Sequence, residues 1–550
     1  AAGHPVTAEA GAAVLRAGGN AVDAVIAASL ASWASEPLLT GPGAGGYLMV
    51  AGHGRTPELL DFFVAAPSHG PRAELVPVDV SFGDANQVFH AGAASVGAYG
   101  CPAGLQAGAE RWGTRPLAEL AAPAAELARA GVPLNAIQAY IVEILEGILT
   151  LTPEVRSRFA PGGQLLKEGE LFRCSDLATT IERFGADGAD PFYRGDIAAA
   201  VVGYVAEHGG TLTADDLAAY EAIVRAPVQV EYAGNSVFTN PPPSAGGALL
   251  AAALDRLAGR NDPAEPPTPD ELVEVMGHAQ LLRTAEFDSQ LADPGFIEKF
   301  IAANLGSTTH ISVLDSNGMA CSLTCTNGEG SGLIAPGTGI HLNNIMGEED
   351  LSPQGFFTAP AGRRMPSMMA PTVVLDEAGS VQIVIGSAGS NRIRSAILQA
   401  VTGVIDHGRD AQEAVDAPRL HFEGDVIYTE PGSVSEGWQE PQGKERADFR
   451  EPNLFFGGVQ AVCRDPRTGQ VTAAGDPRRG GGGGLRSGPP PPSCSPQRPR
   501  PRGGRPGSPD AVLLEIHDTQ APVRRKRLRH PPQQFDRPLE LRVRVDDQDR

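Results

Sequence analysis

The sequence predicts a mixed α+β fold in which a helix-rich part is followed by a sheet-rich part. Before residue 260, several segments repeat apolar residues at helical spacing. From Thr308 onward the pattern changes to short runs rich in β-branched residues, separated by turn sequences such as Asn-Gly. The chain has 550 residues, more than a single hydrophobic core normally serves. We therefore expect one large domain or two halves in intimate contact.

The first segments along the chain predict two helices and a strand. Residues 5–35 have apolar side chains at helical spacing, interrupted at Gly18-Gly19-Asn20, a sequence that ends one helix and begins another. The glycine-rich stretch 41–52 then runs into a short apolar strand. Glycine-rich loops can hold phosphate, but this one precedes a strand and lacks the Lys-Ser/Thr of a phosphate loop. We interpret its glycines as positions where backbones pack closely.

The rest of the helix-rich part alternates alanine-rich helices with loops. Thr213 and Asp215 stand where a helix N-terminus needs capping groups, and a strand follows them. The stretch 240–259 turns from a proline loop into a further helix. Two helices return late in the chain, within the sheet-rich part. The other helical stretches expected are 103–132, 136–150, 393–406 and 409–417.

Short runs supply the strands of the sheet-rich part, namely THISVLD, MACSLTCT, PTVVLD and VQIVIGSAG. Cys321 and Cys325 lie four residues apart in one of them, and a strand places such residues on one face. No second cysteine pair or histidine cluster accompanies them at zinc spacing. We interpret the six cysteines as small buried hydrophobic residues rather than as a disulfide framework or a metal site.

The net charge of −21 is unevenly spread along the chain. Residues 486–550 carry 14 Lys and Arg against 8 Asp and Glu, so the remainder is strongly acidic. An acidic body argues against nucleic acid or an anionic membrane as the main partner, and no apolar run is long enough to span a bilayer. The Gly-, Pro- and Arg-rich stretch 486–550 predicts a disordered tail. Its basic run 524–529 leaves nucleic-acid binding open as a minor alternative.

The segment 307–332 contains the best candidate for chemistry. A threonine hydroxyl is a poor nucleophile unless a base lies beside it. Cleavage of the chain in front of the threonine frees its own α-amine to serve as that base. Ser307 followed by Thr308 at the head of a strand supplies the small preceding residue and the fixed position that this reaction needs. A Thr-Thr-His triplet is weak evidence by itself, so the assignment depends on the rest of the chain.

The run TTHISVLDSNGMACSLT resembles the start of the small subunit in γ-glutamyltranspeptidases, a family of N-terminal-nucleophile hydrolases. Further matching blocks follow in the family's order and extend over roughly residues 1–483. They are HPVTAEAGAAVLRAGGNAVDAVIAA, GGTLTADDLAAY, PPPSAGGALL, GTGIHLNN, RRMPSMMAPT, GSAGSNRI and GDPRRGG. On this series the chain is identified as a member of that family.

The resemblance implies roles for four residues around the cleavage point. Thr308 is the nucleophile, and the chain is cut between Ser307 and Thr308. Thr326 matches the threonine that contacts the nucleophile's amine and assists processing. Asn327 matches a substrate-side asparagine, although the sequence is two residues shorter just after it.

The resemblance also implies a subsite for the substrate and an oxyanion hole. Glu348 takes the place of the acidic residue that holds a glutamyl α-ammonium group. Ser367 matches one of two adjacent serines that bind the α-carboxylate, and Pro366 stands at the other position. The N–H groups of Gly389 and Ser390 match the oxyanion hole, whose donors stabilise the charge that develops on the carbonyl oxygen.

One departure from the family pattern concerns the α-carboxylate. The family's glutamyl enzymes carry an arginine whose guanidinium grips that group, and Phe63 stands at its position in DFFVAAP, residues 61–67. A phenyl ring cannot bind a carboxylate. The reaction class is therefore better supported than the glutamyl specificity. The lid stretch 347–362 also lacks a tyrosine, which favours hydrolysis by water over transfer to a peptide acceptor.

Membership implies a four-layer αββα sandwich that cleaves itself. Residues 1–307 and 308–485 would form two fragments that stay associated, and the small-molecule substrate would be a γ-glutamyl amide such as glutathione, cleaved through an acyl-threonine. The threonine mechanism needs no metal or organic cofactor. Three alternatives stay open: an acylase on a non-glutamyl substrate, a carbon–carbon-bond hydrolase, and an unprocessed, inactive homologue. The sequence does not specify a cellular compartment.

Overall fold

Two antiparallel sheets form the centre of the structure and lie face to face. The computed structural model describes residues 1–484, apart from residues 53, 71, 82–85, 261–264, 282–307, 353–354 and 390. The first sheet has the strand order β10-β11-β1-β2-β7, and the second has the order β20-β19-β15-β14-β9-β8. Strands β10 and β11 contact β15 across the interface, and β1 contacts β14. The predicted tail 486–550 lies outside the described residues.

Strands from both parts of the sequence build each sheet. The first contains β10 (Thr309–Leu314), β11 (Met319–Thr326), β1 (Gly45–Gly52), β2 (Arg55–Phe62) and β7 (Ile223–Arg225). The second contains β20 (Val471–Gly475), β19 (Gly458–Arg464), β15 (Val381–Ala388), β14 (Thr372–Leu375), β9 (Asn235–Thr239) and β8 (Val228–Tyr232). Every neighbouring pair in both sheets is antiparallel.

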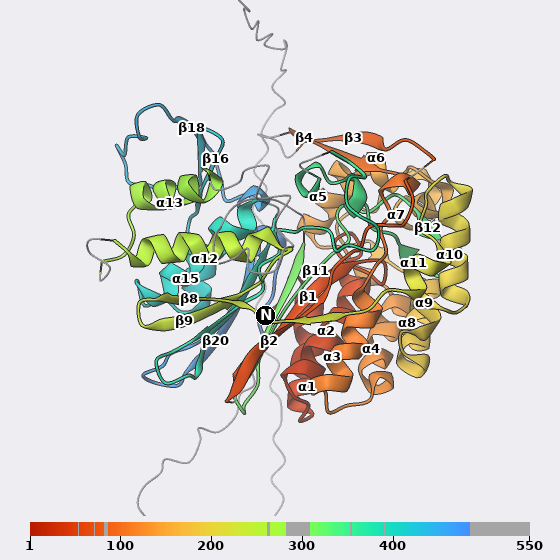
Figure 1. Ribbon diagram of the computed structural model, residues 1–550, viewed down its shortest axis with the longest axis horizontal. Helices are drawn as coiled ribbons and strands as arrows, with labels where there is room; N and C mark the ends of the chain where they lie inside the picture. The colour runs from red at the N-terminus through yellow and green to blue at the C-terminus, as the bar shows by residue number, and fades with distance from the viewer. Residues whose placement is uncertain are drawn as a thin grey trace, which may run out of the picture. The chain divides into compact units, whose positions relative to one another are not determined.

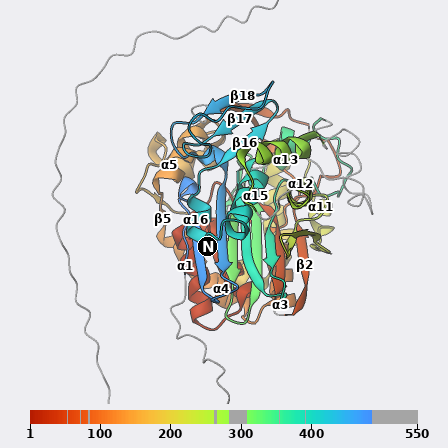
Figure 2. The ribbon, with the colours of Figure 1, turned by 90° about the vertical axis from the view of Figure 1, so that its left-hand side faces the viewer.

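Helices lie against the outer faces of these sheets (Figure 1). On the first sheet α2 contacts β10 and β11, and α3 contacts β1 and β2. On the second sheet α15 contacts β15 and β19, and α12 contacts β8 and β9. Figure 2 views the body from this second side, with α15 and α16 in front of the strands. These helices and their neighbours are α1 (Pro5–Arg16), α2 (Ala21–Ser35), α3 (Cys101–Trp112), α4 (Leu117–Ala130), α12 (Ala245–Ala258), α13 (Pro269–Leu281), α15 (Arg392–Ile405) and α16 (Ala411–Asp416).

Further elements surround this core. The remaining α-helices are α5 (Ala136–Ile144), α6 (Glu146–Leu149), α7 (Pro153–Phe159), α8 (Ser175–Asp187), α9 (Asp190–Tyr193), α10 (Asp196–Glu207) and α11 (Ala214–Ala218). The smaller sheets pair β3 (Val76–Ser81) with β4 (Asn86–Ala91), β5 (Val132–Pro133) with β6 (Leu171–Phe172), and β12 (Ile334–Ala335) with β13 (Ile340–His341). A third group contains β16 (Leu420–Glu423), β17 (Val426–Thr429) and β18 (Glu445–Asp448). None of the helices in the described ranges is long and apolar enough to cross a membrane.

Helix α2 is the buried helix on which the first sheet rests. All 15 of its residues are buried, as expected for a helix that is apolar around its whole circumference. Asn20 caps it by accepting from the Asp23 N–H, while the Asp23 carboxylate accepts from the Asn20 N–H. Asp315 then accepts from the Ala21 N–H, which ties the turn between β10 and β11 to the start of α2. Helix α2 therefore holds β10 in two ways: it packs against one face of the strand, and its first residue is hydrogen-bonded to the turn after the strand.

The glycines of residues 41–52 allow close backbone packing, as the sequence predicts. A Cβ added at Gly45 would lie 2.6 Å from the Val64 nitrogen, and one added at Gly46 would lie 2.4 Å from the Thr324 carbonyl oxygen. Any side chain at these positions would push β1 away from its neighbours. The described cysteines are buried, as their interpretation as small buried hydrophobic residues predicts.

Most predicted helices are present, but the stretch 103–132 is not one helix. Helix α3 ends at Trp112 and α4 begins at Leu117. The link between them contains Gly113 and Pro116, and the buried Asp23 carboxylate accepts from the backbone N–H of Thr114. The glycine, the proline and this hydrogen bond all favour a bend in the chain rather than a continuous helix. The second predicted stretch, 136–150, is likewise divided into α5 and α6.

Candidate active site

Thr308 is fixed at the entrance to β10. It directly precedes Thr309, which pairs with Cys325 of β11. Continuing this antiparallel register by one residue places Thr308 opposite Thr326, the last residue of β11. Thr308 is 0% exposed. Its hydroxyl makes no hydrogen bond to any described residue, so its oxygen is available to a reacting group.

Four of the predicted site residues line one small cavity. They are Thr308, Thr326, Glu348 and Ser367. The other lining residues are mostly apolar: Phe63, Gly328, Ile345, Leu351, Met368 and Met369. The cavity measures about 10 Å³, enough for about one water molecule. An acyl group therefore requires some of these wall side chains to move before it can reach Thr308.

The hydroxyl of Thr326 is oriented by the turn that follows β11. The backbone N–H of Gly328 donates to Thr326 Oγ1 over 2.9 Å. Gly328 has φ of 60°, and a Cβ there would lie 2.0 Å from Asn344 Oδ1 and 2.7 Å from Glu348 Oε1. Glycine is needed here because the Asn344 and Glu348 side chains approach the turn this closely. The turn thus brings Glu348 toward the two threonines.

Ser367 is held in place by hydroxyl groups from other elements. Its Oγ lies 3.0 Å from Ser244 Oγ and 3.5 Å from the Tyr47 hydroxyl. The Ser244 hydroxyl also contacts the Met369 carbonyl oxygen over 2.8 Å. Burial, reinforced by the nearby Asp61 carboxylate, raises the pKa of Tyr47 well above its usual value. Tyr47 therefore remains a neutral phenol beside Ser367.

Phe63 occupies the wall at the position where the family pattern has arginine. Its side chain is 0% exposed. Its backbone N–H donates to Asp61 Oδ1 over 2.9 Å, and its carbonyl accepts from the Tyr220 hydroxyl over 2.7 Å. The Asp61 carboxylate pairs with Arg225 at 2.7 Å. Within the described part of the chain no lysine or arginine lines the cavity.

The remaining predicted site residues are not part of this lining. Asn327 donates from its amide to the His341 carbonyl over 3.1 Å and is not among the lining residues. Gly389 directly follows β15 with φ of 116°, and a Cβ there would lie 2.6 Å from Gly457 Cα. Its position requires glycine, and its role as an oxyanion donor stays a prediction. Ser307 and Ser390 lie outside the described residues.

Two contributors to the site were not anticipated from the sequence. Tyr47 lies in the apolar run GGYLMV, which indicates an ordinary buried strand. Ser244 precedes α12 and has the residue type of a helix cap, but it makes no side-chain capping bond. Its hydroxyl contacts the Ser367 carbonyl instead, 123 residues away. No local pattern in the sequence indicates either contact.

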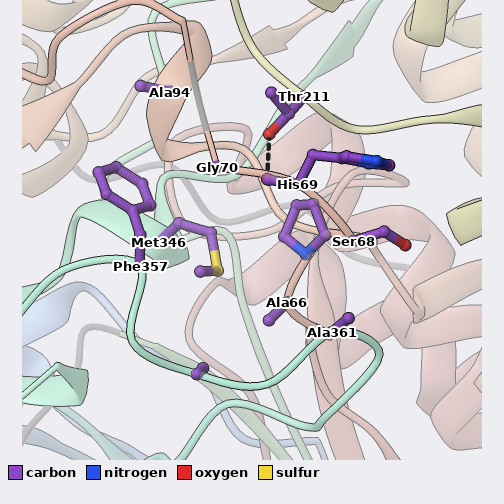
Figure 3. A pocket seen from close by; sticks show the side chains of 11 residues that line it. Ala66, Ser68, His69, Gly70, Ala94, Thr211, Met346, Phe357 and Ala361 are labelled. Atoms are coloured by element: carbon purple, nitrogen blue, oxygen red, sulfur yellow. Dashed lines mark hydrogen bonds between the residues drawn. The ribbon is translucent and has the colours of Figure 1, made fainter.

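A larger pocket lies outside the catalytic cavity (Figure 3). Its volume is about 100 Å³. Its walls come from the loop 66–70, from Met346, and from the segment between Phe357 and Ala361. The Thr211 hydroxyl donates to the His69 carbonyl over 2.7 Å at its edge.

Comparison with known proteins shows which family the chain resembles along its length. A family model described as gamma-glutamyltranspeptidase matches residues 7–305 and 298–485. The glutathione hydrolase proenzyme of Escherichia coli (strain K12) is 29% identical over 514 residues, covering 84% of this chain and 87% of the relative. The acylase ACY 1 proenzyme of Pseudomonas sp. (strain SE83) is 29% identical over 508 residues, covering 86% and 90%.

A solved structure shows the same likeness in three dimensions. The cephalosporin acylase from Bacillus halodurans superposes with a TM-score of 0.73 at 25% identity, covering 88% of this chain and 94% of that chain. These three relatives are named as one hydrolase and two acylases, and the two curated ones are named as proenzymes. Because the family model spans nearly all of residues 7–485, the chain belongs to the γ-glutamyltranspeptidase family of N-terminal-nucleophile hydrolases.

Proposed function

We propose that the chain cleaves itself between Ser307 and Thr308 and then hydrolyses amides with Thr308 as nucleophile. Residues 1–307 and 308–485 become two associated fragments of one four-layer αββα body. The observation that carries this proposal is the Thr308 hydroxyl, which is buried, makes no hydrogen bond to a described residue, and lines one cavity with Thr326, Glu348 and Ser367. The proenzyme names of the relatives support it.

Self-cleavage and turnover use the same hydroxyl. In cleavage, Thr308 Oγ1 attacks the carbonyl carbon of residue 307, the C–N bond breaks, and the nitrogen takes a proton to become an amine. Water then hydrolyses the resulting ester and restores the hydroxyl. In turnover, the freed amine accepts the hydroxyl proton while the oxygen attacks the substrate amide. The amine half leaves with a proton, and water releases the acyl group from Thr308.

A γ-glutamyl amide such as glutathione is the first candidate substrate. The Glu348 carboxylate is 4% exposed at the cavity and can pair with an α-ammonium group. The Ser367 hydroxyl can donate to a carboxylate oxygen. Curated relatives named glutathione hydrolase support this choice.

A second candidate is an acyl group that lacks the α-carboxylate. The observation that favours it is the cavity wall, where Phe63, Met368 and Met369 supply apolar surface and no cation lines the described part. A buried carboxylate without a cationic partner loses much of its hydration energy uncompensated. An ammonium group paired with the Glu348 carboxylate would have its lost hydration energy offset by that pairing. Relatives named acylase show that the family is not confined to glutathione hydrolases.

Two experiments test the function in order. Intact-mass analysis of the wild type beside Thr308→Ala should show two fragments meeting at 307/308 in the wild type alone. Three anilides then differ only in the acyl group: γ-glutamyl, 4-aminobutyryl without the α-carboxylate, and glutaryl without the ammonium. We expect the two ammonium-bearing compounds to react and glutaryl anilide to be slowest. An uncut wild-type chain would refute the function, whereas a fastest glutaryl anilide would refute only the role of Glu348.

A further inference from the structure

Two chain segments contribute residues both to the pocket of Figure 3 and to the catalytic cavity. The 3-10 helix η3 (Ile345–Gly347) turns Ile345 toward the catalytic cavity and Met346 toward the pocket. In the same way Phe63 lines the cavity and Ala66 lines the pocket. Three extended residues span about 10 Å. Because Ile345 and Met346 are consecutive residues, the pocket adjoins the catalytic cavity in which the amide carbonyl would lie.

The chemistry of the pocket suits an uncharged, flat group. Figure 3 shows Phe357 and Met346 side by side on one side of the pocket, while the His69 side chain extends away from them. No lysine, arginine, aspartate or glutamate lines it among the residues that the structure describes. Phe357 has φ of 62°, a conformation that a bulky residue rarely adopts, and the residue is 38% exposed. The fold thus presents an aromatic ring to the pocket at a cost in backbone strain.

We propose that this pocket binds the amine half of the amide substrate and selects neutral, planar amines over small or carboxylate-bearing ones. This inference rests on the proposed function, because it takes Thr308 as the reacting residue. An aromatic amine gains contact with Phe357 and with the Met346 thioether. A carboxylate in the amine half meets no cation among the described lining residues.

The test compares two amides with the same acyl group. γ-Glutamyl anilide carries an aromatic amine half, and γ-glutamyl methylamide carries one too small to reach the pocket. We expect Phe357→Ala to raise KM for the anilide about 5-fold, while KM for the methylamide stays within twofold. Leu171→Ala, another exposed apolar position, is the control and should change neither. Equal shifts for both amides, or none, would overturn the proposal while leaving self-cleavage and the proposed function intact.

A second inference concerns a buried carboxylate beside the nucleophile. Glu36 directly follows α2 and is 3% exposed. Its carboxylate accepts from the Thr7 hydroxyl over 2.7 Å and from the Thr309 hydroxyl over 2.5 Å. No lysine, arginine or histidine in the described ranges forms an ion pair with it. Burial raises the pKa of Glu36, although both hydroxyls act against this shift.

Glu36 contacts the residue that directly follows Thr308. Neighbouring side chains on a strand point to opposite faces, so Thr309 faces α2 while Thr308 faces the cavity. Holding Thr309 against Glu36 therefore fixes the rotation of the strand at Thr308. The geometry points to Glu36 as a positioning residue for the nucleophile, acting through Thr309. This inference also takes Thr308 as the nucleophile, but it does not depend on the pocket described above.

Two threonines provide a matched pair of variants. Thr7 and Thr309 are both buried, and both donate to Glu36, but only Thr309 adjoins Thr308. We expect Thr309→Val to slow self-cleavage and to lower kcat about 10-fold, with KM within twofold. Thr7→Val should lower only the melting temperature. Glu36→Gln, which keeps the size but accepts fewer hydrogen bonds, should behave as Thr309→Val, and the double variant should be no slower than either single one.

The readouts separate positioning from stability. Melting temperatures are measured on each variant in a Thr308→Ala background, where the chain stays uncut. If Thr7→Val and Thr309→Val slow cleavage equally, in proportion to their loss of stability, Glu36 has only a structural role. If Glu36→Gln does not fold, the comparison of Thr7→Val with Thr309→Val alone decides the question. Normal cleavage by the wild type keeps the proposed function intact in either case.

Discussion

The ring of Phe63 stacks on the ring of Tyr47, with centroids 5.7 Å apart and planes inclined by 25°. The Tyr47 hydroxyl in turn lies 3.5 Å from Ser367 Oγ. Tyr47 therefore contacts both Phe63, at the family's arginine position, and Ser367, a predicted substrate-binding residue. Phe63 and Ser367 both line the cavity together with Glu348.

Phe63→Arg should shift selectivity toward the α-carboxylate. A charge-assisted pair contributes about 1.5–3 kcal/mol, so we expect kcat/KM for γ-glutamyl anilide to rise at least about 10-fold relative to 4-aminobutyryl anilide. The variant should also be less stable, because the position is fully buried. Phe63→Leu is the control and should leave the ratio of the two substrates unchanged. An unchanged ratio in Phe63→Arg would show that the cavity wall does not contact the carboxylate.

Thr326→Val should slow self-cleavage about 100-fold, which is the scale of a lost acid–base or orienting contact. The change removes the oxygen that accepts from the Gly328 N–H and that lies in the cavity with Thr308. Thr326→Ser keeps the oxygen and should cleave at nearly the normal rate. The measurement is the appearance of the two fragments by intact mass over time. Equal rates in the two variants would remove Thr326 from the mechanism.

Gly389→Ala should lower kcat about 100-fold, because losing one oxyanion donor has effects of that size. An added Cβ meets Gly457 Cα at 2.6 Å, so the turn must shift. Gly379→Ala is the matched control. It also has a positive φ, 74°, but nothing lies within 4 Å of the added Cβ. The control should lower stability without changing kcat, and a similar kcat in both variants would argue against an oxyanion role for this turn.

Stability should fall as the pH is lowered below 6.5. Burial lowers the pKa of His310 to about 3 and that of His341 to about 4. The unfolded chain therefore binds more protons than the folded one between these values and pH 6.5. The free energy of unfolding then decreases with falling pH, by up to about 1.4 kcal/mol per pH unit for each histidine.

The measurement is urea unfolding of the Thr308→Ala variant at pH 7.5, 6 and 5. His310 lies between Thr324 Oγ1 at 2.7 Å and Ser312 Oγ at 2.9 Å, and no carboxylate among the residues that the structure describes is hydrogen-bonded to it. In His310→Asn the free energy of unfolding should depend less steeply on pH, because the unfolded chain then binds about one proton fewer. A dependence identical to that of the parent would show that His310 does not contribute.

Local patterns in the sequence predicted the elements that carry the site. The Asn20 cap and the apolar run after it predicted α2, and the β-branched run after Thr308 predicted β10. The family motifs predicted four residues that the fold brings to one cavity. Contacts between distant segments could not be predicted in this way. Glu36 and Thr309 are 273 residues apart, and no pattern around Glu36 distinguishes it from a solvent-exposed helix end.

The mixed origin of the strands determines how a cleaved molecule would behave. Strands β10 and β11 follow residue 307, but they pair with β1, which precedes it, and β14 pairs with β9 in the same way. Neither fragment holds a complete sheet, so neither has a stable fold of its own. Because unfolding of the cut molecule would release two separate chains, its melting temperature would rise with its concentration. Fragments produced in separate cells would have to fold together to give activity, so the intact precursor serves as the template for its own assembly.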